Sequence, residues 1–334
     1  MSSYIAVAAV VVLALAAALP ARAEPLRIRI GWAVVPAQLT AILFEKKDIP
    51  KHYGTSYTCE PIRFRGSAPQ ITALAAGELD IAAFAFSTFG LAIQNARMED
   101  IRVIGDLYQD GVPGYYTSQY VVRADGPIRT IADLKGKVLA SNGIGGAIDM
   151  AMRKMLKDHG LEEKRDYSIV EIQFANMIAT LEERKVDLAG LVTPFSIQAE
   201  RTGLTRTLFT IKDAMGETQT TLMAARKPFI EKNRAALVDF FEDVQRATRW
   251  YLDPGNHDEA VDIVAKFTKQ PKAELADWVF TKDDYYRDPD VRPNLRALQS
   301  NLRDQKALDL LKIDIDVTRY ADLSLVDEAA RRAR

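Results

Sequence analysis

Cysteine and histidine are scarce in this chain of 334 residues, which contains one Cys and three His. A single cysteine, Cys59, cannot form an intramolecular disulfide, and His52, His159 and His257 do not have the spacing of metal ligands. The G-x-S-x-G pattern of serine hydrolases is also missing. We therefore expect no catalytic residues, no metal and no cofactor, so the chain is predicted not to be an enzyme.

The chain also lacks the excess of positive charge that binding to a polyanion requires. The chain has 44 Lys+Arg against 45 Asp+Glu, a formal net charge of −1, which gives no electrostatic case for nucleic acid or an anionic membrane. Its 48% hydrophobic and 27% charged residues are ordinary for a folded protein, and its length is enough for two domains.

The N-terminus has the pattern of a signal peptide. Residues 4–19 are apolar and uncharged, and Pro20 and the small-x-small sequence Ala21-Arg22-Ala23 precede Glu24. The run is shorter than the ~20 residues that span a bilayer, which disfavours the alternative of a retained membrane anchor. We predict cleavage after residue 23 and a mature periplasmic protein, although the first four residues lack Lys and Arg.

Strand and helix patterns alternate twice along the mature chain. The first set has strands at Leu26–Trp32, Thr58–Phe64, Asp80–Phe86 and Ile101–Leu107, with helices at Ala37–Phe44, after the capping residue Ser67, and at Phe89–Ala96. The second has strands at Val138–Ala140, Ile169–Phe174, Asp187–Val192 and Arg206–Phe209, with helices at Gly146–His159, Ile178–Arg184 and near Ser196–Glu200. Such alternation predicts an α/β fold with two lobes, each a mostly parallel sheet flanked by helices.

The two sets share a short stretch of similar sequence at a constant offset of 107 residues, in which Asp80 corresponds to Asp187. Both aspartates begin strands, so we expect them in turns remote from the ligand-binding edge of each sheet. The extended stretches within Asp110–Arg123 and Glu217–Ala224 are predicted to join the lobes as a two-strand hinge beside a cleft. The predicted domains are residues 24–117 (first lobe), 118–219 (second lobe) and 220–334 (return to the first lobe, with Phe229–Tyr251 its longest helix).

Several stretches of the mature chain resemble a known family. They are Leu74–Ile81 (LAAGELDI), Ile131–Val138 (IADLKGKV), Phe229–Asn233 (FIEKN) and Tyr320–Val326 (YADLSLV). In this order they resemble the periplasmic solute-binding proteins of ABC importers in the nitrate/sulfonate/taurine group, which also includes thiamine-precursor (pyrimidine) binders. The resemblance implies a monomeric, type II-like two-lobed receptor that closes on a small solute and delivers it to a membrane permease with its cytoplasmic ATPase. The alternative is binding of a thiamine-pyrimidine precursor, or a pyrimidine-forming enzyme or sensor on the same scaffold.

The best local candidate for a ligand site is the glycine-rich turn Ser141–Ala147, between a strand and a helix. Free amides at a helix start suit an anion. A dinucleotide loop is excluded because Ile148 takes the place of its third glycine. A tight turn without a ligand remains the alternative.

Other candidates follow from the rule that ligands bind at the carboxyl ends of parallel strands. Together with the turn, the predicted ligand-binding residues are Trp32, Gln38, Arg65, Ser67, Phe86, Ser87, Thr88, Tyr116, Ser141, Asn142, Gly145, Gly146, Ala147, Asn176, Thr193 and Phe195. For each of them a packing or capping role is the alternative, and Arg65 is either a counter-ion or a solvated strand end.

These residues predict a small organic molecule with one anionic end, a sulfonate, carboxylate or aromatic acid. Its anion would rest on the amides of Gly145–Ala147, and Trp32, Phe86 and Phe195 would give apolar surface to its body. Members of the group that the chain resembles often have a glycine-containing turn where Ala85–Thr88 stands, so a bulkier pocket floor disfavours inorganic anions. With at most one Arg among the candidates, a doubly charged solute is also disfavoured.

Overall fold

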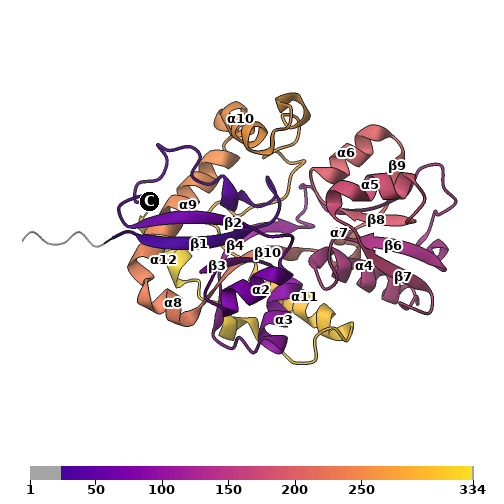
Figure 1. Cartoon of the computed structure of the whole chain (residues 1–334), viewed down its shortest axis with the longest axis horizontal. Coiled ribbons are helices and arrows are strands. Elements are labelled where there is room, and N and C mark those ends of the chain that lie inside the picture. Colours follow the sequence, from indigo (N-terminus) through magenta and orange to yellow (C-terminus); the bar gives the residue numbers. More distant parts are fainter. Residues whose placement is uncertain (1–23, 333–334) are drawn as a thin grey trace, which may run out of the picture.

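Two sheets of five strands each organise the computed structural model, which describes residues 24–332. The first lobe has the strand order β2-β1-β3-β10-β4 and the second β7-β6-β8-β5-β9. Figure 1 shows the lobes side by side. The strands are β1 (Leu26–Trp32), β2 (Tyr57–Arg63), β3 (Ile81–Ala85), β4 (Ile101–Asp110), β5 (Gln119–Arg123), β6 (Lys137–Ser141), β7 (Tyr167–Glu171), β8 (Leu188–Leu191), β9 (Thr205–Thr210) and β10 (Thr218–Arg226).

Helices flank both sheets. The second lobe has η2 (Ile131–Leu134), α4 (Ala147–Asp158), α5 (Phe174–Glu182), α6 (Phe195–Thr202) and α7 (Ile211–Met215). The first lobe has η1 (Leu39–Ala41), α2 (Ala68–Ala75), α3 (Phe86–Asn95), α8 (Lys227–Lys232), α9 (Arg234–Leu252), η3 (Pro254–Asn256), α10 (His257–Thr268), η4 (Lys272–Glu274), α11 (Leu295–Ala307), η5 (Val317–Tyr320) and α12 (Ser324–Arg332). None of the helices in residues 24–332 is both long and apolar enough to cross a membrane. The predicted signal peptide lies outside the described residues.

The predicted fold class is confirmed, because each sheet is mostly parallel. Strands β1, β2 and β3 pair in parallel, as do β6, β7 and β8. The exception in each sheet is the strand that follows a crossing between the lobes. β10 runs antiparallel between β3 and β4, and β5 runs antiparallel between β8 and β9.

The two corresponding aspartates have the same structural role in the two lobes. Asp80 lies in the turn before β3; its carboxylate accepts a hydrogen bond from the amide of Arg29 at 2.8 Å, and its own amide donates to the Arg29 carbonyl at 2.9 Å. Asp187 does the same with Val138 before β8, at 3.0 and 2.7 Å. Each aspartate thus joins a strand to its parallel neighbour at the edge remote from the cleft, which accounts for the short stretch of similar sequence.

The helix expected over Ala37–Phe44 is reduced to the short turn η1. In an α-helix the carbonyls of Pro36 and Ala37 would accept from amides four residues later. Here they accept from the buried Arg287 guanidinium, at 2.8 and 3.2 Å. Arg287 therefore fixes this loop in a non-helical form.

The single helix expected over Phe229–Tyr251 is also wrong, because the chain breaks between α8 and α9 at Asn233. The Asn233 side chain donates to the Phe229 carbonyl at 2.9 Å, and its backbone (φ −117°, ψ 19°) is not helical. Asparagine competes with the helix in this way because its short amide reaches nearby backbone groups. The predicted apolar stripe of the helix is nonetheless buried at Leu237, Phe240, Phe241, Val244 and Ala247.

Candidate ligand-binding cleft

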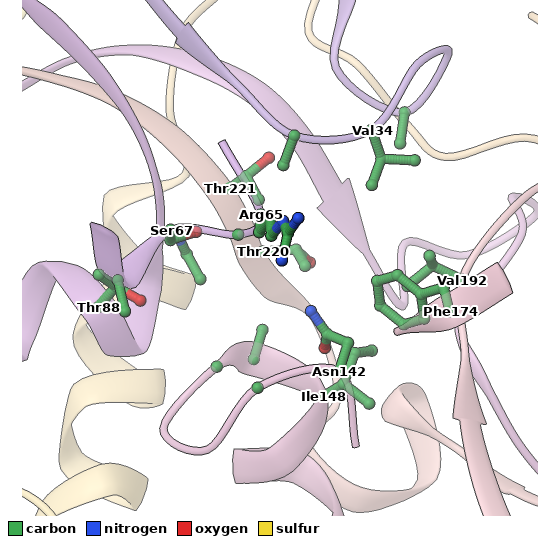
Figure 2. A pocket seen from close by; sticks show the side chains of 18 of the residues that line it. Val34, Arg65, Ser67, Thr88, Asn142, Ile148, Phe174, Val192, Thr220 and Thr221 are labelled. Atoms are coloured by element: carbon green, nitrogen blue, oxygen red, sulfur yellow. Dashed lines mark hydrogen bonds between the residues drawn. The ribbon is translucent and has the colours of Figure 1, made fainter. Parts of the chain in front are cut away.

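A cavity of about 370 Å³ lies between the two lobes, and we call it the inner cavity (Figure 2). A second hollow of about 970 Å³, the outer chamber, adjoins it. The two share a set of lining residues, Ala33, Val34, Arg65, Gly66, Asn142, Gln173 and Phe174. The cleft is therefore continuous from the inner cavity to the outer chamber.

The first lobe lines the inner cavity with loops that follow its parallel strands. The loop after β1 contributes Ala33, Val34, Ala37 and Gln38, and the loop after β2 contributes residues 65–69. Ala85 of β3, Thr88 of α3, Tyr108 of β4, and Thr220 and Thr221 of β10 complete this wall. These positions follow the rule that parallel sheets bind ligands at the carboxyl ends of their strands.

The second lobe supplies the opposite wall. The loop between β6 and α4 contributes Asn142, Gly143, Ile144 and Gly146, and the first turn of α4 contributes Ala147 and Ile148. The end of β7 and the residues that follow it contribute Glu171, Gln173 and Phe174. In Figure 2 the side chain of Asn142 points toward Arg65, which comes from the first lobe. A ligand in this cavity would therefore touch both lobes at once.

Arg65 is the one cationic side chain that the described residues bring to the inner cavity, and Glu171 is the one acid. The exposed Arg65 guanidinium makes no ion pair or hydrogen bond with any described residue. Glu171 is partly engaged, since one of its carboxylate oxygens accepts from the amide of Ile144 at 2.6 Å. The available positive charge in the inner cavity is therefore that of Arg65.

The amides of the glycine-rich turn are only partly available. The Gly145 amide donates to the buried Asp149 carboxylate at 2.9 Å, and the Gly146 amide donates to the Gly143 carbonyl at 3.2 Å. An anion resting on the Gly145 and Gly146 amides would therefore have to replace these hydrogen bonds, and that placement stays a prediction. Among the described residues no acceptor meets the amides of Ala147 and Ile148, which begin α4 and line the cavity.

The carboxylate of Asp149 reaches back over the turn because it stands four residues after Gly145, at the third position of α4. Burial raises its pKa, while the Arg153 guanidinium 2.8 Å away and the Gly145 amide lower it. Gly145 itself has φ +79°, a conformation that glycine adopts without strain. The turn is thus held in a fixed shape by its own helix.

The structure brings only part of the predicted residues to the cleft. Those that line the inner cavity are Gln38, Arg65, Ser67, Thr88, Asn142, Gly146 and Ala147. Those that line the outer chamber are Trp32, Arg65, Asn142 and Phe195. Those that line neither are Phe86, Ser87, Tyr116, Ser141, Gly145, Asn176 and Thr193.

Phe86 lies outside both cavities because β3 ends at Ala85, one residue earlier than expected. Phe86 already begins α3, and its side chain is fully buried in the core of the first lobe, so it does not form a pocket floor.

Ser67 lines the inner cavity, but it does not cap α2 with its side chain as expected. Its hydroxyl accepts from the Ala85 amide at 3.0 Å and joins the loop after β2 to the end of β3.

Tyr116 lies in the first crossing between the lobes, outside both cavities. Its hydroxyl donates to the Ser196 hydroxyl of α6 at 2.5 Å, and its ring packs against that of Tyr285 with centroids 5.1 Å apart. Tyr116 therefore connects the two lobes without lining either cavity.

Sequence reasoning missed several lining residues, namely Tyr108, Glu171, Phe174, Val192, Thr220 and Thr221. The two threonines lie on β10, which the sequence pattern predicts only as a crossing between the lobes. The local signal was the threonine-rich stretch 217–224, since hydroxyls in a buried strand need polar partners. Here Thr220 shares a hydrogen bond of 2.6 Å with Thr218.

Comparison with solved structures identifies the fold class to which these two lobes belong. The fold resembles that of the periplasmic aliphatic sulphonate binding protein SsuA from Escherichia coli, with TM-score 0.69, 19% identity and coverage of 89% of this chain and 92% of that one. The nitrate-binding protein NrtA from Synechocystis PCC 6803 gives TM-score 0.73 at 16% identity, covering 92% and 89%. The desulfurization enzyme DSZB has the same architecture, with TM-score 0.66 at 14% identity, covering 92% of this chain and all of that one. The protein has the two-lobed fold of the periplasmic binding proteins.

The family follows from the sequence match. A binding protein of Brucella abortus (strain 2308) is 24% identical over 261 residues, which are 76% of each chain. The model of the NMT1-like family matches residues 21–265. The chain belongs to the NMT1-like family.

Proposed function

We propose that the protein is the extracytoplasmic receptor of an ABC importer and captures a small organic anion in the inner cavity. The observation that carries this proposal is the Arg65 guanidinium, without an acid partner among the described residues, in a cavity that both lobes line. Receptors for sulphonate and nitrate among the structures of the same fold support it.

The inner cavity favours a single negative charge. Arg65 and the amides of Ala147 and Ile148 can receive one anionic group, and the hydroxyls of Ser67 and Thr88 offer further donors. A second charge would lie near the carboxylate of Glu171 without a second cation to balance it. The volume of about 370 Å³ lies within the range of small-molecule sites and leaves room for an organic body that nitrate does not have.

Closure of the lobes about the two crossings would hold the solute. The moving units of this proposal are residues 24–117 with 220–334, and residues 118–219. Among the contacts that bridge these units away from the crossings are Arg201 with Asp277 at 2.7 Å, and Lys154 and Lys157 with α11, where Lys157 donates to the Ala307 carbonyl at 2.6 Å. Exposed pairs of this kind are weak enough to break when the cleft opens.

A catalytic role has little support in this cleft. His52, His159, His257 and Cys59 are absent from the linings of both cavities. Cys59 lies in β2, and burial raises the pKa of its thiol, so the reactive thiolate is disfavoured. Export to the periplasm, a monomeric state and partnership with a permease and its ATPase complete the proposal.

A thermal-unfolding screen of residues 24–334 tests it. The panel contains organic sulfonates, carboxylates, aromatic acids, pyrimidines, nitrate, phosphate and organic cations. A ligand that binds only the folded state raises the free energy of unfolding by about 2.7 kcal/mol when its concentration is 100 times its Kd. We expect at least one organic monoanion to raise the unfolding temperature, and a response to cations or pyrimidines alone would contradict the proposal.

A further inference from the structure

Aromatic side chains from both lobes line the outer chamber. Trp32 and Phe267 of the first lobe pack edge to face with ring centroids 5.6 Å apart. Phe174 and Phe195 of the second lobe stack at 5.7 Å with their planes 17° apart. All four are only partly buried, so part of each ring is accessible to a ligand.

The charge of the outer chamber is positive. Arg63 and Arg65 line it, and no acidic residue is among its described lining residues. The Arg63 guanidinium lies 5.6 Å from the centroid of the Trp32 ring, a cation–π distance. Arg65 also lines the inner cavity, so it stands where the two spaces meet.

The chamber also has a rim that joins the lobes. The chain continues from Phe267, Thr268 and Gln270, which line the chamber, to the segment that holds Asp277. Arg201 of α6 binds this segment through the Asp277 carboxylate and the Glu274 carbonyl, at 2.7 and 3.0 Å. The aromatic walls therefore lie near each other while this contact is formed.

We propose that the outer chamber is an aromatic subsite, so that the solute is an elongated aromatic acid whose anion binds Arg65 and whose rings lie between Trp32–Phe267 and Phe174–Phe195. This inference rests on the proposed function and specifies its solute class. A ring in the chamber would meet aromatic faces from both lobes and the positive charge of Arg63. Each well-formed ring pair contributes roughly two- to tenfold in affinity beyond the burial of its area.

Titration with a series of sulfonates of increasing length tests the subsite. The probes are methanesulfonate, benzenesulfonate and biphenyl-4-sulfonate, with acetate, benzoate and biphenyl-4-carboxylate as a second series. We expect affinity to rise at least tenfold from the methyl to the biphenyl compound in at least one series. Trp32 fluorescence should change only with the aromatic probes, and a Trp32→Phe variant isolates its signal from those of Trp250 and Trp278, which lie outside the chamber.

Conservative variants separate the subsite from the anion site. Phe195→Leu and Phe267→Leu should lower affinity for the biphenyl probe about three- to tenfold and leave the methyl probe unchanged. Phe229→Leu is the matched control, since Phe229 is also partly buried but lies outside the cleft. Arg65→Gln should weaken every probe that binds.

The outcomes distinguish the two proposals. Equal affinity for methyl and biphenyl probes, with unchanged Trp32 fluorescence, overturns the aromatic subsite but leaves an organic-anion receptor standing. Absence of binding by every anion in both series overturns the proposed function and the subsite together.

Discussion

Replacement of Arg65 by glutamine removes the one cation that the described residues bring to the inner cavity. The variant keeps a polar side chain of similar reach but lacks the charge and the forked donors of the guanidinium. Because Arg65 makes no ion pair or hydrogen bond with other described residues, the fold does not depend on its charge. The substitution therefore separates binding from stability.

The expected magnitude follows from the surroundings of the side chain. Hydrogen bonds to charged groups contribute about 1.5–3 kcal/mol. Arg65 is exposed in the ligand-free cleft, so solvent screening favours the lower end of this range. About 1.5 kcal/mol corresponds to a loss of affinity of roughly tenfold.

Isothermal titration with the best-binding acid of the screen measures this loss. Arg65→Lys, which keeps the charge but not the fork, should bind with intermediate affinity. Arg27→Gln is the matched control, because Arg27 pairs with Glu60 on the exposed surface of β1 and β2, outside the cleft. In the absence of ligand, the free energy of unfolding of each variant should differ from that of the unmodified protein by less than about 0.5 kcal/mol. Binding by Arg65→Gln within twofold of the unmodified protein would refute the reasoning.

Three further predictions concern the turn, the rim and a buried carboxyl. Gly145→Ala should lower solute affinity several-fold because its φ of +79° is strained for alanine, whereas Gly160→Ala, which carries the same strain (φ +77°) outside both cavities, should bind normally in the same titration. Arg201→Gln should break the contact with Asp277, increase the radius of gyration by solution scattering and weaken binding by less than about fivefold; an unchanged radius would count against it. Burial raises the pKa of Asp106 to about 7, above its ordinary value of 3.8. Between about pH 4 and pH 7 the folded state therefore holds a proton on Asp106 that the unfolded state has released. Stability should therefore fall as the pH rises from about 4 to 7, and a denaturation series in which Asp106→Asn leaves that slope unchanged would contradict this assignment.

The alternation of strands and helices predicted the fold well, because each apolar strand has a covering helix next to it in the sequence. The loops after β1, β2 and β6 could be assigned to the cleft on topology alone, which identified Arg65 and Asn142. The contribution of Thr220 and Thr221 could not, because it depends on the insertion of β10 between β3 and β4. No local pattern encodes that pairing.

Other errors arose from single side chains that redirect the backbone. Arg287 comes from about 250 residues away to hold the carbonyls of Pro36 and Ala37, so no local propensity predicts the missing helix. The hydrogen bond of the Gly145 amide could have been predicted from the sequence, because an acidic side chain at the third position of a helix often accepts from an amide at the helix N-terminus. Asp149 stands at that position of α4.

The most direct test of the account is the crystal structure of the protein with the tightest-binding organic acid of the screen. We expect the acid between the lobes, with its anionic group within hydrogen-bond distance of the Arg65 guanidinium and near the amides of Ala147 and Ile148 at the start of α4. Its body should extend toward Trp32. An acid bound outside the cleft, or bound within it with its anionic group away from Arg65, would contradict the central claim.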